Sequence, residues 1–465
     1  MNRPQNLAEL RRSGWVSRPV KDEVRSNAMA RMAAGAPVVA GLLGYDDTVL
    51  PQLENALLAG HDVIFLGERG QAKTRIIRSL VELLDEWAPV VAGSEINDDP
   101  YNPVSRHARD LMAERGEDTP IEWVHRSRRF GEKLATPDTS IADLIGEVDP
   151  IRVAEGRYLA DELTIHYGLV PRTNRGIFAI NELPDLAERI QVGLLNVLEE
   201  RDVQIRGYRV RLPLDVLLVA SANPEDYTNR GRIITPLKDR FGAQVRTHYP
   251  SEVATEMAVV AQEARPFVSE DIRVTVPAFM AEIVAGITHQ ARRSSHVNQR
   301  SGVSVRLSIA NQETLVANAV RRALRAGERE AAPRVSDLPA LAASTTGKVE
   351  IEALEEGREP EILDRLVRTA VLETWRARIE PEPLRGLVTA FDEGLLVETG
   401  EDVPSARYAE YASLTGMRAA LVGLGTGEAP AELASAIEFV LEGLHLAKRL
   451  NKHTVGGRTT YLGRG

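Results

Sequence analysis

The stretch Val63–Thr74, V-I-F-L-G-E-R-G-Q-A-K-T, constrains the fold of this chain more than any other. Its apolar run predicts a buried strand, which a glycine-containing turn follows. Apolar spacing then predicts a helix over Lys73–Trp87. Strand, glycine turn and helix in this order are typical of a phosphate-binding loop, although Ala72 stands where the pattern G-x-x-x-x-G-K-[ST] has Gly before the Lys.

The loop can bind a nucleotide through its backbone and two side chains. Backbone N–H groups in such a turn converge on phosphate oxygens, and the next helix N-terminus adds a positive dipole. Lys73 would bridge the terminal phosphates, and the Thr74 hydroxyl would hold Mg²⁺. If position 72 requires a positive φ, Ala72 is penalised; if it is helical, Ala72 costs almost nothing. An ordinary strand–turn–helix is an equally good interpretation of this loop alone. The predicted binding residues are Gly67, Glu68, Arg69, Gly70, Gln71, Ala72, Lys73 and Thr74.

A second buried strand, Gly176–Ile180, leads into two polar residues, Asn181 and Glu182. In phosphate-loop enzymes such a strand ends in an acidic pair, of which one acid orients Mg²⁺ through water and the other activates the attacking water. Glu182 stands in the position of the base. Asn181 replaces the Asp without its negative charge, so we expect weaker Mg²⁺ binding and slower turnover. A buried strand that merely ends in polar residues is the alternative.

Three further side chains are candidates for a role in hydrolysis. Asn223 follows a third buried strand, Val216–Ala220, and could position the attacking water near the terminal phosphate. It could equally start a turn before the next proline. Arg240 and Arg306 stand in helix-rich stretches, where an arginine either stabilises charge on the transferring phosphoryl group or lies solvated on the surface.

The order of these motifs resembles the AAA+ ATPases, and within them the branch of the magnesium-chelatase I subunit and MoxR. The matching stretches are Gly41–Thr74, D-L-I-G-E-V-D-P-I, G-I-F-A-I-N-E-L, L-L-V-A-S-A-N-P-E and P-L-K-D-R-F, with a weaker match at Ser304–Leu307. The resemblance implies ATP and Mg²⁺ as cofactors. It also implies Lys73 and Thr74 as Walker A, Asn181 and Glu182 as Walker B, Asn223 as sensor one, Arg240 as the arginine finger and Arg306 as sensor two. Arg230 and Arg232 lie close to Arg240, so the choice of finger stays open.

The predicted fold class is α/β: a P-loop AAA+ doubly wound parallel sheet, a helical lid and an extra, mostly helical C-terminal region. The expected domains are an N-terminal arm or loosely docked helix at 1–40, a nucleotide-binding core with insertions at 41–250, a lid at 251–345, and a C-terminal region with a flexible tail at 346–465. We expect a further core strand near Pro89–Ala92 or Ile121–Val124, an insertion around Asp143–Asn174 and a hairpin over Val203–Leu214.

Composition limits the compartment and the partners. The net charge of -10 over 465 residues argues against a broad nucleic-acid surface, and the absence of Cys excludes disulfides and thiolate metal sites. The sequence has no apolar run long enough for a membrane span and no secretion signal, so we expect a cytoplasmic protein. The nine His show no paired metal spacing, which argues against a transition-metal site.

The resemblance implies a ring-forming ATPase, by analogy a hexamer, because the arginine finger in this family comes from a neighbouring subunit. Similar proteins act on a partner with a von Willebrand factor A domain, in metal insertion or in protein maturation. Ala72 and Asn181 leave a second possibility, a scaffold that binds nucleotide without useful hydrolysis. A DNA-acting relative, such as a helicase loader or a sigma-factor activator, has support only from the basic cluster Arg126–Arg129, and the chain lacks the G-A-F-T-G-A loop of the activators.

Overall fold

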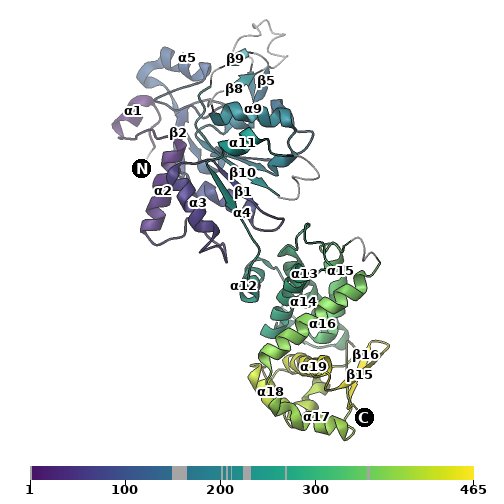
Figure 1. Ribbon diagram of the computed structural model, residues 1–465. Coiled ribbons are helices and arrows are strands. Elements are labelled where there is room, and N and C mark those ends of the chain that lie inside the picture. Colours follow the sequence, from purple (N-terminus) through teal and green to yellow (C-terminus); the bar gives the residue numbers. More distant parts are fainter. Residues whose placement is uncertain are drawn as a thin grey trace. The chain divides into compact units, whose positions relative to one another are not determined.

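The computed structural model describes residues 3–148, 165–199, 203–205, 208–210, 212–223, 232–267, 270–352 and 357–464. The chain divides into two compact units, Met1–His248 and Tyr249–Gly465, and each is described by itself (Figure 1). Arg230 and residues 149–164 of the expected insertion lie outside the described residues.

The first unit is built on a parallel sheet with the strand order β11-β1-β10-β7-β4, which confirms the predicted fold class. Its strands are β1 (Val63–Leu66), β4 (Phe130–Leu134), β7 (Gly176–Asn181), β10 (Val216–Ala222) and β11 (Ala243–Arg246). All residues of β1, β7 and β10 are buried. Both faces of the sheet are covered, and this explains the unbroken apolar runs of these strands.

Helices form a layer on each face of this sheet. The helices of the unit are α1 (Leu7–Arg12), α2 (Val20–Ala33), α3 (Val49–Ala59), α4 (Lys73–Ser79), α5 (Arg106–Arg115), α6 (Ile141–Leu144), α8 (Leu169–Arg172), α9 (Glu188–Glu199) and α11 (Thr235–Arg240). Val63 and Phe65 of β1 pack with α2, α3 and α4, whereas Ile64 and Leu66 pack with α9 and α11. Alternate residues of one strand therefore serve two separate cores.

The helix that follows the loop is shorter than the sequence predicts. It was expected to reach Trp87, but α4 ends at Ser79, a 3-10 helix η1 (Leu80–Leu83) follows, and Trp87 already begins β2 (Trp87–Val91). The N–H of Asp85 donates to the carboxylate of Glu23 at 2.7 Å instead of to a helix carbonyl. The apolar spacing continued through the 3-10 turn, so it did not reveal the end of the α-helix.

The expected core strand also lies elsewhere. Both candidate segments are strands, but within the described part of the chain β2 and β3 (Ile121–His125) pair only with each other, antiparallel, in a separate two-stranded sheet. The strand beside β7 is β4, whose sequence F-G-E-K-L has little apolar character. It forms the edge of the sheet, where charged residues are common because they discourage further pairing.

The N-terminal segment is packed rather than loosely docked. Val20, Val24 and Ala28 of α2 are buried in the same core as β1. Glu23 on α2 forms a buried ion pair with Arg129, with Nη2 and Oε2 2.6 Å apart. The apolar spacing did not predict the packing of this helix because its buried face includes a charged residue, Glu23, and a small one, Ala28.

The second unit is mostly helical. Its helices are α12 (Val253–Glu263), α13 (Ala278–Arg293), α14 (Arg306–Ala326), α15 (Ala342–Thr346), α16 (Glu359–Arg378), α17 (Arg385–Asp392), α18 (Met417–Gly423) and α19 (Pro430–Leu446), with 3-10 helices η6 (Val335–Leu341), η8 (Glu382–Leu384) and η9 (Ser405–Ser413). The expected lid and C-terminal region share one hydrophobic core, in which Phe279 of α13 stacks on Phe439 of α19 at a ring-centroid distance of 4.5 Å.

The tail is ordered, contrary to the expectation of a flexible end. Asn451–Val455 (β15) and Arg458–Leu462 (β16) form a hairpin, and β14 (Val397–Gly400) pairs with the other edge of β16. Gly456 and Gly457 join the two strands with φ of 59° and 86°, which two-residue hairpin turns favour. The glycine pair that indicated flexibility is a tight turn.

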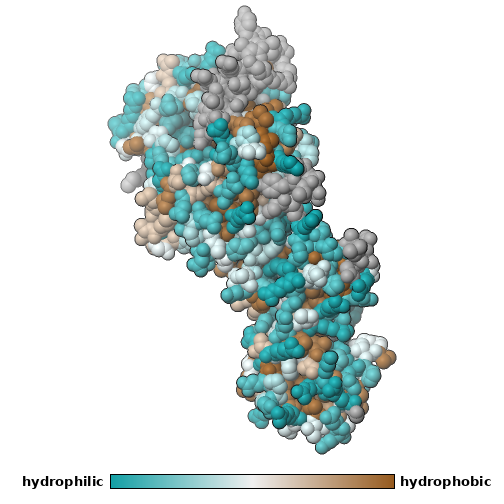
Figure 2. Space-filling view, in the orientation of Figure 1, coloured by the Kyte–Doolittle hydropathy of each residue, from teal (hydrophilic) through white to brown (hydrophobic). Residues whose placement is uncertain are grey.

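The surface carries mostly hydrophilic residues on the face shown in Figure 2, with apolar groups between them. Within the described part of the chain, no helix is long and apolar enough to cross a membrane.

Candidate nucleotide site

The glycine loop joins β1 to α4, and its backbone settles what Ala72 costs. Ala72 is the N-cap of α4 and has φ 56° and ψ 12°, in the left-handed region. Gly70 also has a positive φ, of 74°. An L-residue with a side chain pays about 1–2 kcal/mol in this region. Position 72 therefore favours glycine, and Ala72 is accommodated at a cost.

Lys73, the first residue of α4, points back into the loop. Its ammonium donates to the carbonyls of Gly67 and Glu68, the latter at 2.8 Å, and to Oδ1 of Asn223 at 3.3 Å. Only 6% of Lys73 is exposed. Asn223 directly follows β10, the strand beside β1. The structure thus brings together two of the predicted site residues from positions 150 residues apart in the chain.

Gln71 ties the loop to the neighbouring strand β11. Its side-chain oxygen accepts hydrogen bonds from the N–H of Glu68 at 3.0 Å and from the hydroxyl of Thr247 at 2.8 Å. A Cβ on Gly67 would lie 2.0 Å from that hydroxyl oxygen, so Gly67 leaves room for this bridge. The hydroxyl of Tyr45 donates to the Gln71 carbonyl at 2.8 Å, and burial raises the Tyr45 pKa.

The polar ends of β7 and β10 are joined by Ser221. Its hydroxyl donates to Oδ1 of Asn181 at 3.3 Å and accepts from the N–H of Glu182 at 3.2 Å. Glu182 has φ 55°, so its backbone turns sharply at the end of β7. Asn181 and Glu182 therefore lie at the same edge of the sheet as the loop, as expected for the carboxyl ends of parallel strands.

Glu132 on the edge strand β4 is the charged group that the sequence interpretation missed. Its carboxylate accepts from Nδ2 of Asn181 at 2.5 Å and from Nε of Arg78 at 2.8 Å. The hydrogen bond from Arg78 to Glu132 raises the Arg78 pKa. Glu132 was overlooked because its strand was assigned to other segments; recognising F-G-E-K-L as an edge strand would have placed it beside Asn181.

A cavity of about 250 Å³ adjoins the loop. It is lined by Leu66, Gly67, Glu68, Gln71, Lys238, Arg246 and Thr247. Lys238 belongs to P-L-K-D-R-F, but no role was predicted for it, and Arg246 was not singled out. The signal for Arg246 and Thr247 is their position at the carboxyl end of β11.

The remaining predicted residues are half-buried or exposed. Thr74 is half-buried on α4, and Arg69 is exposed in the loop. Arg240 is exposed at the last residue of α11, and Arg232 is exposed as well. Arg306 is exposed at the first residue of α14, in the second unit. The finger and sensor-two assignments stay predictions.

The basic cluster Arg126–Arg129 is largely engaged within the first unit. Arg129 is buried against Glu23, and Arg126 lies 2.5 Å from Glu82. Arg128 is exposed. Two of these three arginines serve internal ion pairs, which weakens the only sequence support for a DNA-binding surface.

Comparison with known proteins gives one family match and several relatives. The model of the sigma-54 interaction domain matches residues 155–240. The magnesium-chelatase subunit ChlI of Anabaena variabilis is 30% identical over 211 residues, which cover 43% of this chain and 57% of that protein. ChlI of Nephroselmis olivacea is 27% identical over 297 residues, which cover 59% of this chain and 78% of that protein. The magnesium-chelatase 38 kDa subunit of Cereibacter sphaeroides is 30% identical over 212 residues, covering 43% and 55%.

Two solved structures are also similar. A chain from the complex between subunits BchI and BchD of magnesium chelatase is 21% identical and covers 69% of this chain and 97% of its own length, with a TM-score of 0.35. NtrX from Brucella abortus is 16% identical, and the match covers 78% of this chain and 69% of the NtrX chain, with a TM-score of 0.39.

The parallel sheet confirms the predicted α/β fold class, and the sequence relatives of this chain belong to the AAA+ class that the order of the motifs resembles. Its relatives within that class are magnesium-chelatase I subunits, and the chain spans little more than half the length of the first of them.

Proposed function

We propose that the chain is a ring-forming AAA+ ATPase that couples ATP binding and hydrolysis to remodelling or metal-insertion work on a partner protein in the cytoplasm. The observation that carries this proposal is the 3.3 Å contact between Lys73 and Asn223. It joins the phosphate loop to the strand end where a water-positioning group is expected.

The residues at this edge fit a magnesium nucleotide. Among the described residues, no three His, Asp or Glu side chains group closely enough to hold a metal ion by themselves. Mg²⁺ is commonly held by one or two protein groups together with substrate phosphates and water. The Thr74 hydroxyl and, through water, Asn181 would be the protein's share, while the loop amides and Lys73 would hold the phosphates.

In turnover, ATP would supply the phosphoryl group, and the Mg²⁺ bound with it would neutralise part of the phosphate charge. Lys73 holds the terminal phosphates, and Glu182 takes the proton of the attacking water. Asn223 orients that water, and its contact with Lys73 keeps the amide directed at the loop. The position of these side chains at one edge of the sheet supports these roles.

The ring and the partner rest on the family resemblance of the motifs. Arg240, or Arg232 or Arg230 in its place, would complete the site of a neighbouring copy, by analogy in a hexamer. A partner with a von Willebrand factor A domain is what the family resemblance of the motifs implies. ATP between copies would favour one ring shape, and hydrolysis would release it. Mass measurement with and without ATP tests this, and a strict monomer in ATP would leave Arg240 without a catalytic task.

A second candidate function is a nucleotide-binding scaffold with little hydrolysis. The left-handed backbone of Ala72 and the missing charge at Asn181 both favour it. A DNA-acting role has the sigma-54 domain match on its side, but Arg126 and Arg129 are paired internally. That role predicts salt-sensitive duplex binding that charge reversal at Arg128 weakens.

ATP turnover in Mg²⁺ tests the proposal, with Lys73→Ala and Glu182→Gln as variants. We expect slow but measurable turnover in the wild type, and none above background in either variant. Wild-type turnover at background with ATP still bound would support the scaffold instead. Binding that persists in Glu182→Gln separates loss of chemistry from loss of the nucleotide.

A further inference from the structure

The magnesium position lacks a charge on its own strand but has one beside it. Asn181, at the end of β7, is buried and neutral. β4 runs parallel to β7 with Leu134 opposite Asn181, so Glu132, two residues earlier, lies on the same face of the sheet. The carboxylate of Glu132 reaches the Asn181 amide at 2.5 Å.

We propose that Glu132 supplies, from the neighbouring strand, the negative charge that Asn181 lacks at the magnesium position. Glu132 acts as a positioning residue: it fixes the Asn181 amide and places a carboxylate beside it. The pair would together do the work of one acidic residue at the end of β7. This inference rests on the proposed nucleotide site.

The hydrogen-bond partners of Glu132 do not fully compensate its negative charge. One carboxylate oxygen accepts from Asn181, and the other accepts from Arg78 on α4. The Arg78 side chain is 64% exposed, whereas that of Glu132 is 20% exposed. Water screens the exposed guanidinium strongly, so Arg78 compensates only part of the carboxylate charge.

The hydrogen bond also explains why an amide suits position 181. An Asp there would put two carboxylates in contact, and such a pair ionises fully only at a large cost. Asn181 instead donates to Glu132 through Nδ2 and keeps Oδ1 directed at Ser221. The alternative is that Glu132 only ties β4 to α4 through Arg78, and the experiment below separates the two.

The test compares the affinity of the full chain for a fluorescent, non-hydrolysable ATP analogue in Mg²⁺ and in EDTA. The ratio of the two dissociation constants measures how much Mg²⁺ strengthens binding. Glu132→Gln keeps the acceptor for Asn181 but removes the charge, and we expect the ratio to fall about 10-fold, as for other groups that orient metal ligands. Binding in EDTA should be unchanged. Glu122→Gln, at an exposed position on β3, is the matched control and should keep the wild-type ratio.

Two further variants separate charge from structure. Glu132→Gln combined with Asn181→Asp moves the carboxylate to the end of β7 and should restore the ratio. Arg78→Gln removes the tie to α4 and should keep the ratio or raise it, so it serves as the readout even if Glu132→Gln does not fold. A structural role alone predicts that Arg78→Gln and Glu132→Gln lose thermal stability together.

The outcomes are distinguishable. A wild-type ratio retained in Glu132→Gln overturns the inference and leaves the nucleotide site intact, and a fall in Arg78→Gln likewise overturns it. A wild-type chain that binds no analogue in either buffer overturns the proposed function, and this inference with it.

Discussion

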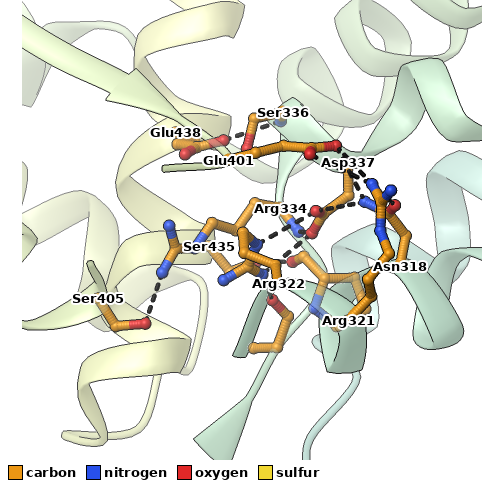
Figure 3. Close-up of polar contacts among 12 residues, drawn as sticks. Asn318, Arg321, Arg322, Arg334, Ser336, Asp337, Glu401, Ser405, Ser435 and Glu438 are labelled. Atoms are coloured by element: carbon orange, nitrogen blue, oxygen red, sulfur yellow. Dashed lines mark hydrogen bonds and ion pairs between the residues drawn. The ribbon is translucent and has the colours of Figure 1, made fainter. Parts of the chain in front are cut away.

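Charged side chains cluster in both units, but they are buried to different degrees. In the second unit, Arg322 donates to both carboxylate oxygens of Asp337, at 3.2 and 3.0 Å, and the N–H of Arg334 donates to the same carboxylate at 2.8 Å. All three residues are buried, and Figure 3 shows them among polar neighbours from segments that were expected to lie in separate domains. Arg334 extends the network to Ser405 on η9.

At the loop of the first unit, the charged groups lead from the interior to the surface. Lys73 is buried, Glu132 is partly exposed and Arg78 is largely exposed. A ligand can reach such groups and exchange with their present partners. In the second unit, the ion pair between Arg322 and Asp337 is buried, and Asn318 connects it to the half-exposed pair of Arg321 and Glu401. This network holds the expected lid and the C-terminal region together. Burial therefore separates the structural cluster from the candidate site.

The largest expected effect is in the buried network. Asp337→Asn keeps the size of the side chain but removes the carboxylate to which Arg322 is hydrogen-bonded. We expect a loss of about 3–5 kcal/mol in the free energy of unfolding. Urea unfolding of the full chain measures it. Glu401→Gln, at the exposed partner of Arg321, is the control and should cost about 1 kcal/mol or less. A similar small loss at Asp337 would contradict the distinction between the clusters.

An asparagine in each unit sharpens the comparison. Asn223→Ala should lower ATP turnover about 100-fold, because it removes a positioned polar group. Asn318 donates to Asp337 at 2.8 Å, so Asn318→Ala should cost about 1–3 kcal/mol of stability and leave turnover unchanged. Steady-state turnover and urea unfolding of both variants check this. A loss of turnover in Asn318→Ala, with turnover retained in Asn223→Ala, would contradict the assignment of the site to the first unit.

A smaller effect is expected at Ala72. Ala72→Gly relieves the left-handed strain, and we expect a gain of about 1 kcal/mol in unfolding free energy. Ala30→Gly, at an exposed position inside α2, provides the control and should lose about 1 kcal/mol. Thermal unfolding of both variants shows whether stability rises in Ala72→Gly and falls in Ala30→Gly. A loss at both positions would mean that the backbone at residue 72 is not strained.

The smallest effect is a pH dependence in the second unit. Burial alone would raise the pKa of Glu256, but His289, whose Nε2 lies 3.4 Å from the carboxylate, and the hydrogen bond from Arg292 at 2.6 Å outweigh it and lower that pKa below the usual 4.5. This contribution to stability is present above pH 4.5 and is lost as the pH falls through the lowered pKa. Melting temperatures between pH 6 and pH 3 should show a weaker acid-side decline in Glu256→Gln. An unchanged decline would rule out this contribution.

The sequence was sufficient where strands are buried on both faces. V-I-F-L, G-I-F-A-I and V-L-L-V-A were placed correctly because a covered parallel strand is apolar throughout. The apolar pattern did not predict the edge strand F-G-E-K-L, because an edge strand needs no apolar run. Glu132, which lies on that strand, was therefore missed. The backbone angle of Ala72 depends on how the loop closes, which the sequence left open. Proximity of Lys73 and Asn223 follows from parallel strand ends, but their roles in catalysis stay predictions.

Equilibrium binding of ATP to the full chain in Mg²⁺ tests most directly whether the strand-end edge of the first unit is a nucleotide site. We expect saturable binding of one nucleotide per chain in the wild type. Lys73→Ala should lose about 10-fold or more in affinity, because it removes a charged hydrogen-bond donor to the phosphates. Binding that is equally strong in wild type and Lys73→Ala, or absent from both at millimolar ATP, would contradict this assignment.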